Sequence, residues 1–130
     1  MGEILRGFTP LFPDNRGTLG VLDFSRLPFD VRRVFWVTST GPSIVRADHA
    51  HLRCSQFLVC ARGQVEFETT QTSRTTESGI LSSGDALLLE PKTWLKLYGF
   101  TTDALLLVFC DLPYDPSEYI NDFNTFMMLD

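Results

Sequence analysis

Short apolar stretches separated by turn residues run along most of the chain. Residues 64–69 alternate strictly, with Val65 and Phe67 on one face and Glu66 and Glu68 on the other, which predicts a half-buried β-strand. Continuous apolar runs are typical of strands buried on both faces. On these patterns we predict further strands over 31–38, 56–60, 86–89 and 104–110. Many short strands with regular turns favour a sandwich or a barrel.

Two segments depart from the strand pattern. Residues 69–78 are polar and rich in Ser and Thr, and we predict a long, solvated hairpin loop there. Residues 115–118 read Asp-Pro-Ser-Glu, which is typical of a helix start. Apolar residues then recur at helical spacing up to Met127, so a short C-terminal helix is expected.

Length and composition indicate one domain over residues 1–130 with a substantial apolar core. The hydrophobic fraction is 44%, and the eleven phenylalanines suit a β-rich interior. A net charge of −5 argues against general binding of nucleic acid or of membrane surfaces, which needs a basic footprint. We see no signal peptide and no apolar run of membrane-spanning length. These two absences, together with the odd number of cysteines (Cys54, Cys60 and Cys110), predict a cytoplasmic protein.

The two histidines of the chain lie one residue apart, as His49-Ala50-His51. In an extended segment, positions i and i+2 project from the same face, so both imidazoles point to one small volume. Asp48 has the opposite parity and is expected outside that volume. Such a pair suits metal coordination, proton transfer, or both.

The spacing of Gly41, His49, His51, Gln56 and Gly63 resembles the first signature of the cupin superfamily. Metal-binding cupins carry Glu where this chain has Gln56, and a neutral amide is a weaker ligand than a carboxylate. The second cupin signature supplies a third histidine after a Gly…Pro segment. Here residues 84–91 supply the Gly and Pro, but no histidine follows. Because a catalytic metal usually needs three protein ligands, the acid/base interpretation is favoured and no metal or other cofactor is expected.

The chain as a whole resembles the dTDP-4-keto-6-deoxyhexose 3,4-ketoisomerases, small cupins of bacterial deoxysugar biosynthesis. The resemblance rests on Arg-Gly-Thr-Leu at 16–19, Pro-Phe-Asp-Val-Arg-Arg-Val-Phe at 28–35, Arg-Ala-Asp-His-Ala-His at 46–51, Gln-Phe-Leu at 56–58, Pro91 with Trp94, and Tyr-Asp-Pro-Ser-Glu-Tyr-Ile at 114–120. Three positions depart from the family pattern. Ala47 replaces Gly, which we expect to be harmless, Trp36 replaces Tyr, and Leu95 stands where many members have His.

The resemblance implies an all-β cupin jelly-roll barrel with a short C-terminal helix, acting as a metal-independent isomerase. It implies His51 as the principal base and His49 as its acid partner. The substrate would be a dTDP-linked keto-deoxysugar, and the protein would be a homodimer. Candidate substrate-binding residues are Arg16, Arg33 and Arg46 for the diphosphate, and Trp36, Gln56 and Trp94 for the sugar or base.

Other interpretations stay open at this stage. The arginines and tryptophans could have ordinary surface or packing roles, and the histidines could be core residues. A related cupin could act as a 3,5-epimerase on sugar nucleotides. Because Trp36 and Leu95 depart from the family, a non-catalytic nucleotide-sugar-binding domain is another alternative, and a metal-dependent dioxygenase is the last.

Overall fold

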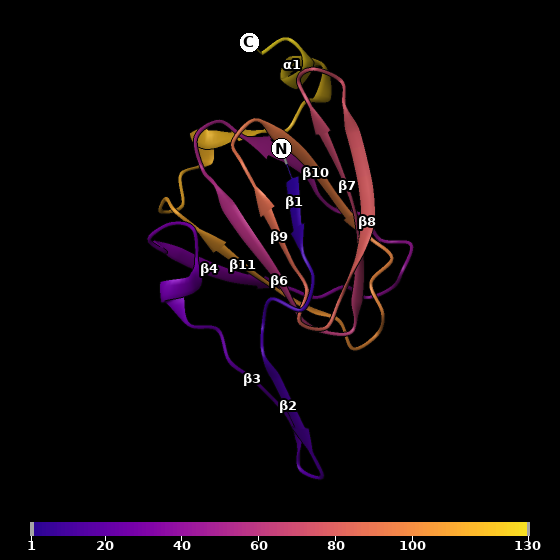
Figure 1. Ribbon diagram of the computed structural model, residues 1–130. Coiled ribbons are helices and arrows are strands. Elements are labelled where there is room, and N and C mark those ends of the chain that lie inside the picture. The colour runs from indigo at the N-terminus through magenta and orange to yellow at the C-terminus, as the bar shows by residue number, and fades with distance from the viewer. Residues whose placement is uncertain (1, 130) are drawn as a thin grey trace.

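The computed structural model describes residues 2–129, which form two facing antiparallel β-sheets (Figure 1). The first sheet has the order β1 (Gly2–Leu5), β9 (Ala86–Leu89), β6 (Gln56–Arg62), β11 (Leu105–Cys110) and β4 (Arg33–Val37). The second has the order β12 (Tyr119–Ile120), β5 (Arg46–His51), β10 (Thr93–Tyr98), β7 (Gln64–Gln71) and β8 (Thr76–Ser82).

The remaining elements lie outside these two sheets. They are the hairpin of β2 (Leu11–Asp14) and β3 (Gly17–Gly20), the 3₁₀ turns η1 (Phe24–Arg26) and η2 (Pro116–Glu118), and helix α1 (Phe123–Met127). Within residues 2–129, no helix is long and apolar enough to cross a membrane. The predicted all-β jelly-roll barrel with a short C-terminal helix is confirmed.

The main core lies between the two sheets. Leu58, Leu106 and Val108 from the first sheet face Val65 and Phe67 from the second, and all five side chains are at most 2% exposed. Each buried side chain of this kind stabilises the fold by about 1.5–3 kcal/mol relative to an exposed one. The alternation seen at 64–69 therefore reports the inward face of β7.

A second apolar layer covers the outer face of the first sheet. Phe57 and Phe109 point outward and pack with Leu27, Phe29 and Val31 from the segment that precedes β4. Strands β6 and β11 are thus apolar on both faces, which explains their continuous apolar sequence.

Two predicted elements are wrong in their extent. The segment 69–78 is not a long loop, because β7 continues to Gln71, β8 begins at Thr76, and Thr69 pairs with Glu77. Threonine is β-branched and favours strands, and here Thr69 and Thr70 are buried. Polarity alone therefore misidentified this hairpin as a loop.

The C-terminal segment is not one continuous helix from residue 115. After η2, Tyr119 and Ile120 form β12, whose residues pair with His51 and Ala50 at the edge of β5. Helix α1 starts only at Phe123, where the Asp122 side chain accepts a hydrogen bond from the backbone N–H of Thr125. Pairing with the free edge of β5 thus makes Tyr119 and Ile120 a strand, although their spacing in the sequence also suits a helix.

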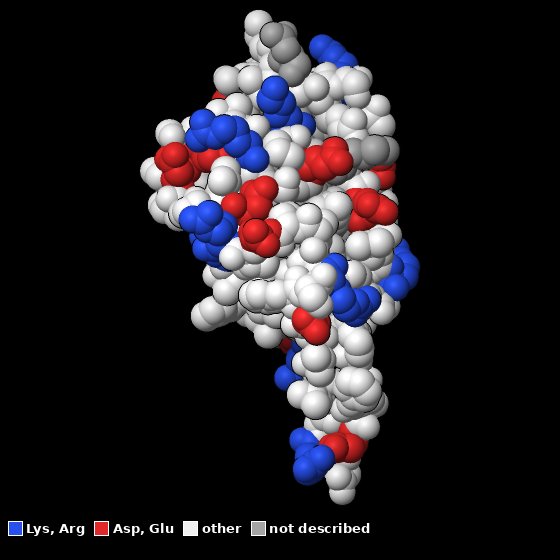
Figure 2. All heavy atoms as spheres, turned by 60° about the vertical axis from the view of Figure 1, so that its left-hand side comes forward, with Lys and Arg blue, Asp and Glu red and all other residues white. Residues whose placement is uncertain are grey.

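The β2–β3 hairpin projects away from the body of the molecule (Figure 1). Figure 2 shows this arm as a protrusion that is uncharged over most of its visible length. Its apolar side chains Phe12 and Leu19 are 56% and 63% exposed. At its turn, Arg16 forms an ion pair with Asp14.

Candidate active site

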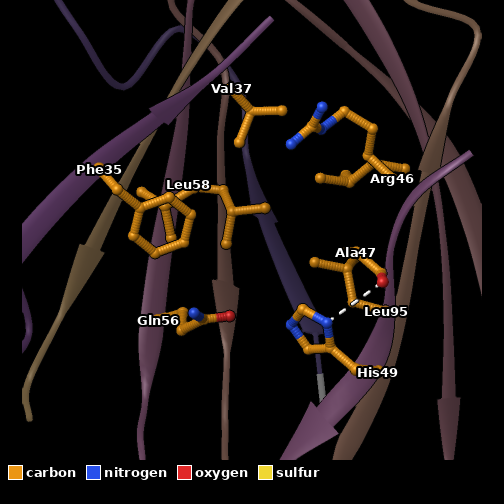
Figure 3. Close-up of a pocket in the computed structure, with 10 residues that line it drawn as sticks. Phe35, Val37, Arg46, Ala47, His49, Gln56, Leu58 and Leu95 are labelled. Atoms are coloured by element: carbon orange, nitrogen blue, oxygen red, sulfur yellow. Dashed lines mark hydrogen bonds between the residues drawn. The ribbon is translucent and has the colours of Figure 1, made fainter. Parts of the chain in front are cut away.

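A cavity of about 120 Å³ opens between the two sheets, with His49 on its wall (Figure 3). Strands from both sheets contribute to its lining: Phe35, Val37, Arg46, Ala47, His49, Gln56, Leu58, Leu95, Leu97 and Val108. The lining is apolar except for three side chains. These are the His49 imidazole, the Gln56 amide and the Arg46 guanidinium. A few polar groups in an apolar pocket can orient a polar ligand.

A bulge in β5 shapes this wall. Along β10, Leu95 pairs with His49 and the next residue, Lys96, pairs with Ala47, so Asp48 is left over. Ala47 and Asp48 have φ values of 64° and 59°, in the left-handed region. As predicted, Asp48 points out of the cavity, where its carboxylate accepts a hydrogen bond of 2.9 Å from the Trp94 indole.

The bulge corrects one expectation about Ala47. A left-handed φ costs an L-residue with a Cβ energy that glycine avoids. The glycine of the family pattern therefore has a conformational reason, and alanine at this position carries strain. Because of the bulge, Arg46 and His49 both line the cavity although they differ in parity.

The two imidazoles meet edge to face, with ring centroids 5.1 Å apart. His49 Nδ1 lies 3.1 Å from the carbonyl oxygen of Ala47. Because that oxygen can only accept, Nδ1 carries the proton in the neutral ring and Nε2 keeps its lone pair. Burial lowers the pKa of His49 below its usual value.

His51 lies deeper than His49 and is 6% exposed. Burial, followed by the charge of His49, lowers its pKa to about 4. Neither of its ring nitrogens has a hydrogen-bond partner among the described residues. His51 is therefore a neutral imidazole at pH 7, with the lone pair that a base requires.

Glu118 lies beside His51, and the sequence analysis did not name it as a candidate site residue. Its carboxylate is buried and accepts hydrogen bonds from the backbone N–H groups of Arg53 (2.6 Å) and Cys54 (2.9 Å). Its Oε1 lies 3.4 Å from His51 Nδ1. The available signal is its place directly before Tyr119 and Ile120 in the closing motif, but the sequence Asp-Pro-Ser-Glu at 115–118 is equally typical of a helix start.

Tyr119 is the second missed residue. Its ring centroid lies 4.4 Å from that of His51 and 5.1 Å from that of His49. The Arg33 guanidinium donates a hydrogen bond of 3.2 Å to its phenolic oxygen and contacts the Cys110 sulfur at 3.5 Å. Pairing of β12 with β5 therefore brings a phenol and a cation beside the histidines.

The structure brings together five of the eight predicted site residues. His49, Arg46 and Gln56 line the cavity, His51 lies against His49, and Arg33 reaches the same cluster through Tyr119.

The other three lie apart from this cavity. Trp36 points outward from β4 and is 68% exposed, and Arg16 is at the tip of the projecting hairpin. Trp94 packs against Phe123 and Phe126 on the outer face of the second sheet.

The residues at the cupin metal position do not fit a metal ion. Gln56 offers only a neutral amide, and Leu95, which pairs with His49, presents an alkyl side chain to the cavity. Two imidazoles and one amide are a weak donor set for a divalent metal. We therefore derive no catalytic step through a metal at this position.

Comparison with known proteins shows which proteins this chain is similar to. The family model described as FdtA (WxcM-like, C-terminal) matches residues 6–130. A TDP-4-oxo-6-deoxy-alpha-D-glucose-3,4-oxoisomerase of Aneurinibacillus thermoaerophilus is 27% identical over 114 residues, which cover 87% of this chain and 82% of that protein.

Solved structures of similar proteins share the fold over nearly their whole length. A 3,4-ketoisomerase of Helicobacter canadensis is 30% identical, with a TM-score of 0.83 over 97% of this chain and 94% of that one. The WlaRB TDP-quinovose 3,4-ketoisomerase of Campylobacter jejuni is 27% identical, with a TM-score of 0.82 over 97% and 96% of the two chains. The resemblance to sugar 3,4-ketoisomerases is confirmed, and the chain belongs to the FdtA (WxcM-like, C-terminal) family.

Proposed function

We propose that this protein is a sugar-nucleotide 3,4-ketoisomerase that converts a dTDP-linked 4-keto-6-deoxyhexose into its 3-keto isomer. The observation that carries the proposal is the His49–His51 pair beside a buried carboxylate, at a cavity lined mostly by apolar side chains. The relatives named above are isomerases of this kind.

The reaction moves one proton from C3 to C4 and a second one from the C3 oxygen to the C4 oxygen. The C4 carbonyl acidifies the proton on C3, which neutral His51 removes to form an enediol-type intermediate. Protonated His51 gives that proton to the C4 oxygen and becomes neutral again. His49 Nε2, which keeps its lone pair, accepts the proton of the C3 hydroxyl and, as an imidazolium, delivers it to C4, which leaves the carbonyl at C3. The two imidazoles are close enough to act on adjacent carbons of one sugar ring, since their centroids are 5.1 Å apart.

Glu118 acts on His51 as a positioning residue. When His51 accepts a proton, it becomes a cation beside the Glu118 carboxylate, 3.4 Å away. That charge stabilises the imidazolium at the moment of proton transfer, while burial keeps the resting imidazole neutral.

Hydrogen-bond donors can hold the developing enediolate without a metal. The Gln56 amide lines the cavity, and the Tyr119 hydroxyl, which accepts from Arg33, can donate its own proton to a sugar oxygen. We therefore expect isomerase activity to survive treatment with a chelator and to need no added cofactor.

The nucleotide must lie outside the cavity. A volume of about 120 Å³ is well below the ~300–1,000 Å³ of pockets that hold drug-sized ligands. We assign the sugar to the cavity and the diphosphate to Arg46, whose guanidinium matches phosphate geometry. Trp94 supports the β5 bulge through Asp48, and we assign it no ligand contact.

A homodimer accounts for the exposed apolar residues and for the position of Arg16. Phe12 and Leu19 on the hairpin and Trp36 on β4 are all more than half exposed. Burial of these side chains against a second copy would favour association. Arg16 and Trp36 would then contact substrate only across the subunit interface.

All three cysteines are free thiols, which suits the reducing cytoplasm.

The proposal is tested by NMR of dTDP-4-keto-6-deoxyglucose incubated with the protein in D₂O. We expect the 3-keto isomer with deuterium at C4. The variants His51→Asn and His49→Asn should each lower kcat by about 10²- to 10⁴-fold. A lack of exchange at C3 and C4 would sink the proposal.

The same spectra separate the alternatives. Deuterium at C5 instead of C4 would indicate a 3,5-epimerase. Tight binding of the nucleotide sugar without turnover, unchanged when both histidines are replaced by asparagine, would indicate a binding domain. Elemental analysis of protein purified without added metal tests the dioxygenase alternative.

A further inference from the structure

Three buried side chains with metal-binding atoms converge behind the cavity: His51, Cys54 and Glu118. Their nitrogen, sulfur and carboxylate oxygen atoms lie within 4.8 Å of one another, and the three residues are 6%, 4% and 2% exposed. We propose that this triad binds a zinc-class transition-metal ion and that the bound ion inhibits the enzyme by occupying His51.

His51 is the observation that points to a ligand. Both of its ring nitrogens are buried and lack a hydrogen-bond partner among residues 2–129. Buried polar atoms in folded proteins are nearly always paired, with protein, water or an ion. An imidazole that is buried and unpaired is therefore ready to accept a metal.

The spacing of the triad matches tetrahedral coordination. Two ligand atoms that each lie about 2.0–2.1 Å from a tetrahedral zinc are about 3.3–3.4 Å apart. His51 Nδ1 and Glu118 Oε1 are 3.4 Å apart, too far for a good hydrogen bond between nitrogen and oxygen. A zinc–sulfur bond of about 2.3 Å places the thiol about 3.6 Å from each of the other two ligand atoms in a tetrahedral site, and the Cys54 sulfur lies within 4.8 Å of both before any ion binds.

The surroundings hold the ligands in place. Two backbone N–H groups orient the Glu118 carboxylate, and one of them belongs to Cys54 itself. The Cys54 thiol donates a hydrogen bond of 3.3 Å to the Ser55 carbonyl oxygen. The neighbouring Cys110 side chain and burial raise the pKa of Cys54, so the metal ion has to displace the thiol proton as it binds. With one thiolate and one carboxylate, a divalent ion is neutralised within the site.

The donor set selects the class of metal. Thiolate and imidazole ligands favour zinc, cobalt and similar ions over magnesium and calcium, which prefer oxygen. The site differs from the cupin metal position because it uses neither His49 nor Gln56. An ion can reach it past the His49 ring, which lines the cavity and touches His51.

Metal binding at the triad does not depend on the proposed reaction, whereas the inhibition does. The test is therefore titration of the whole protein with Co²⁺, monitored by the thiolate-to-cobalt charge-transfer absorption, followed by displacement with Zn²⁺. Cys54→Ser is the test variant, since serine keeps the shape and removes the thiolate. Cys60→Ser is the matched control, because Cys60 is equally buried but is not one of the triad's ligands.

We expect the absorption band in the wild type and in Cys60→Ser, and its loss in Cys54→Ser. Zinc affinity should fall at least about 10- to 100-fold in Cys54→Ser, the range seen for loss of outer-shell partners. Glu118→Gln should also weaken Zn²⁺ binding, which gives a second measurement if Cys54→Ser folds poorly. In the isomerase assay, Zn²⁺ should inhibit the wild type far more strongly than Cys54→Ser.

Two results would overturn the site. One is the absence of a thiolate band in the wild type. The other is a band that persists in Cys54→Ser, and its loss in Cys110→Ser would then assign the thiolate to the neighbouring cysteine. If the protein proves not to be an isomerase, the absorption and affinity measurements still decide whether the triad binds metal.

Discussion

At His51, burial and the Glu118 carboxylate change the pKa of the imidazole in opposite directions. Burial and the charge of His49 favour the neutral ring, while the Glu118 carboxylate favours the protonated ring. The first two dominate, so the resting residue is a free base. Glu118 then lowers the energy of the imidazolium formed in the proposed reaction.

The depressed pKa predicts an unusual pH–rate profile. The active form of His51 is deprotonated, so kcat/KM should fall only as the pH approaches about 4, instead of near the ordinary histidine value of about 6.5. Because Glu118 raises the pKa of His51, Glu118→Gln should move this acid limb to still lower pH and reduce kcat on the order of 10²-fold.

The matched control for that profile is Glu68→Gln, which lies beside Trp94 and Lys96 and does not line the cavity that holds His49. It should leave both the limb and kcat unchanged. An acid limb of the wild type near pH 6.5, or a limb that stays in place in Glu118→Gln, would contradict the assignment of the base to His51.

The backbone conformation of Ala47 predicts that glycine at this position stabilises the protein. Its φ of 64° is strained for alanine and unstrained for glycine, so Ala47→Gly should raise the free energy of unfolding by about 1 kcal/mol. Urea denaturation measures the change. Ala61→Gly in β6, where φ is not positive, should instead lower the stability, and equal effects in the two variants would argue against strain at the bulge.

At the scale of elements, one added strand assembles much of the site. When β12 pairs with β5, Tyr119 comes opposite His51 and Glu118 lies just before it. The same two residues would be far from the histidines if the segment from 115 formed a continuous helix. Strand pairing at the edge of β5 is thus what creates the cluster.

The tight turn between β6 and β7 predicts that one methyl group added at Gly63 destabilises the protein. Gly63 has a φ of 73°, and a Cβ there would lie 2.8 Å from the Ala104 Cα. Gly63→Ala should lower the free energy of unfolding by about 1–3 kcal/mol. Thermal and urea unfolding provide the measurement.

Gly41→Ala is the control for this turn, since φ is not positive at Gly41 and a Cβ there meets no atom of the described residues within 4 Å. Its stability should stay close to that of the wild type. If Gly63→Ala were as stable as Gly41→Ala, the left-handed turn would not be needed to connect the two sheets.

At the scale of the whole molecule, the projecting hairpin exposes apolar side chains that a second copy can cover. The double variant Phe12→Asp with Leu19→Asp places charge on that surface and should disfavour association. Sedimentation velocity should give a dimer, twice 14.7 kDa, for the wild type and a 14.7 kDa monomer for the variant. Ser73→Asp, on the exposed turn after β7, should remain dimeric.

A monomeric wild type would overturn the homodimer. If the wild type is a dimer and the double variant remains one, the hairpin would not form the interface.

The local sequence predicted strands correctly where each face of a strand lies either wholly in the core or wholly in solvent. Alternation at 64–69 identified β7, and the continuous apolar runs identified β9 and β11, because burial on one or both faces leaves a direct pattern. In the same way, the i and i+2 spacing of the two histidines predicted that their imidazoles lie together, and the ring centroids are 5.1 Å apart. Parity was also sufficient to place Asp48 outside the cavity.

The tertiary structure decided which distant residues join that face. Residues 118–120 carry helical spacing, and only the free edge of β5 converts part of that segment to a strand. Parity could not predict Arg46 in the cavity either, because a bulge changes which face a residue occupies. The sequence by itself thus determined the fold class and the histidine pair, whereas the Glu118–Tyr119 half of the site depends on contacts between segments more than 60 residues apart.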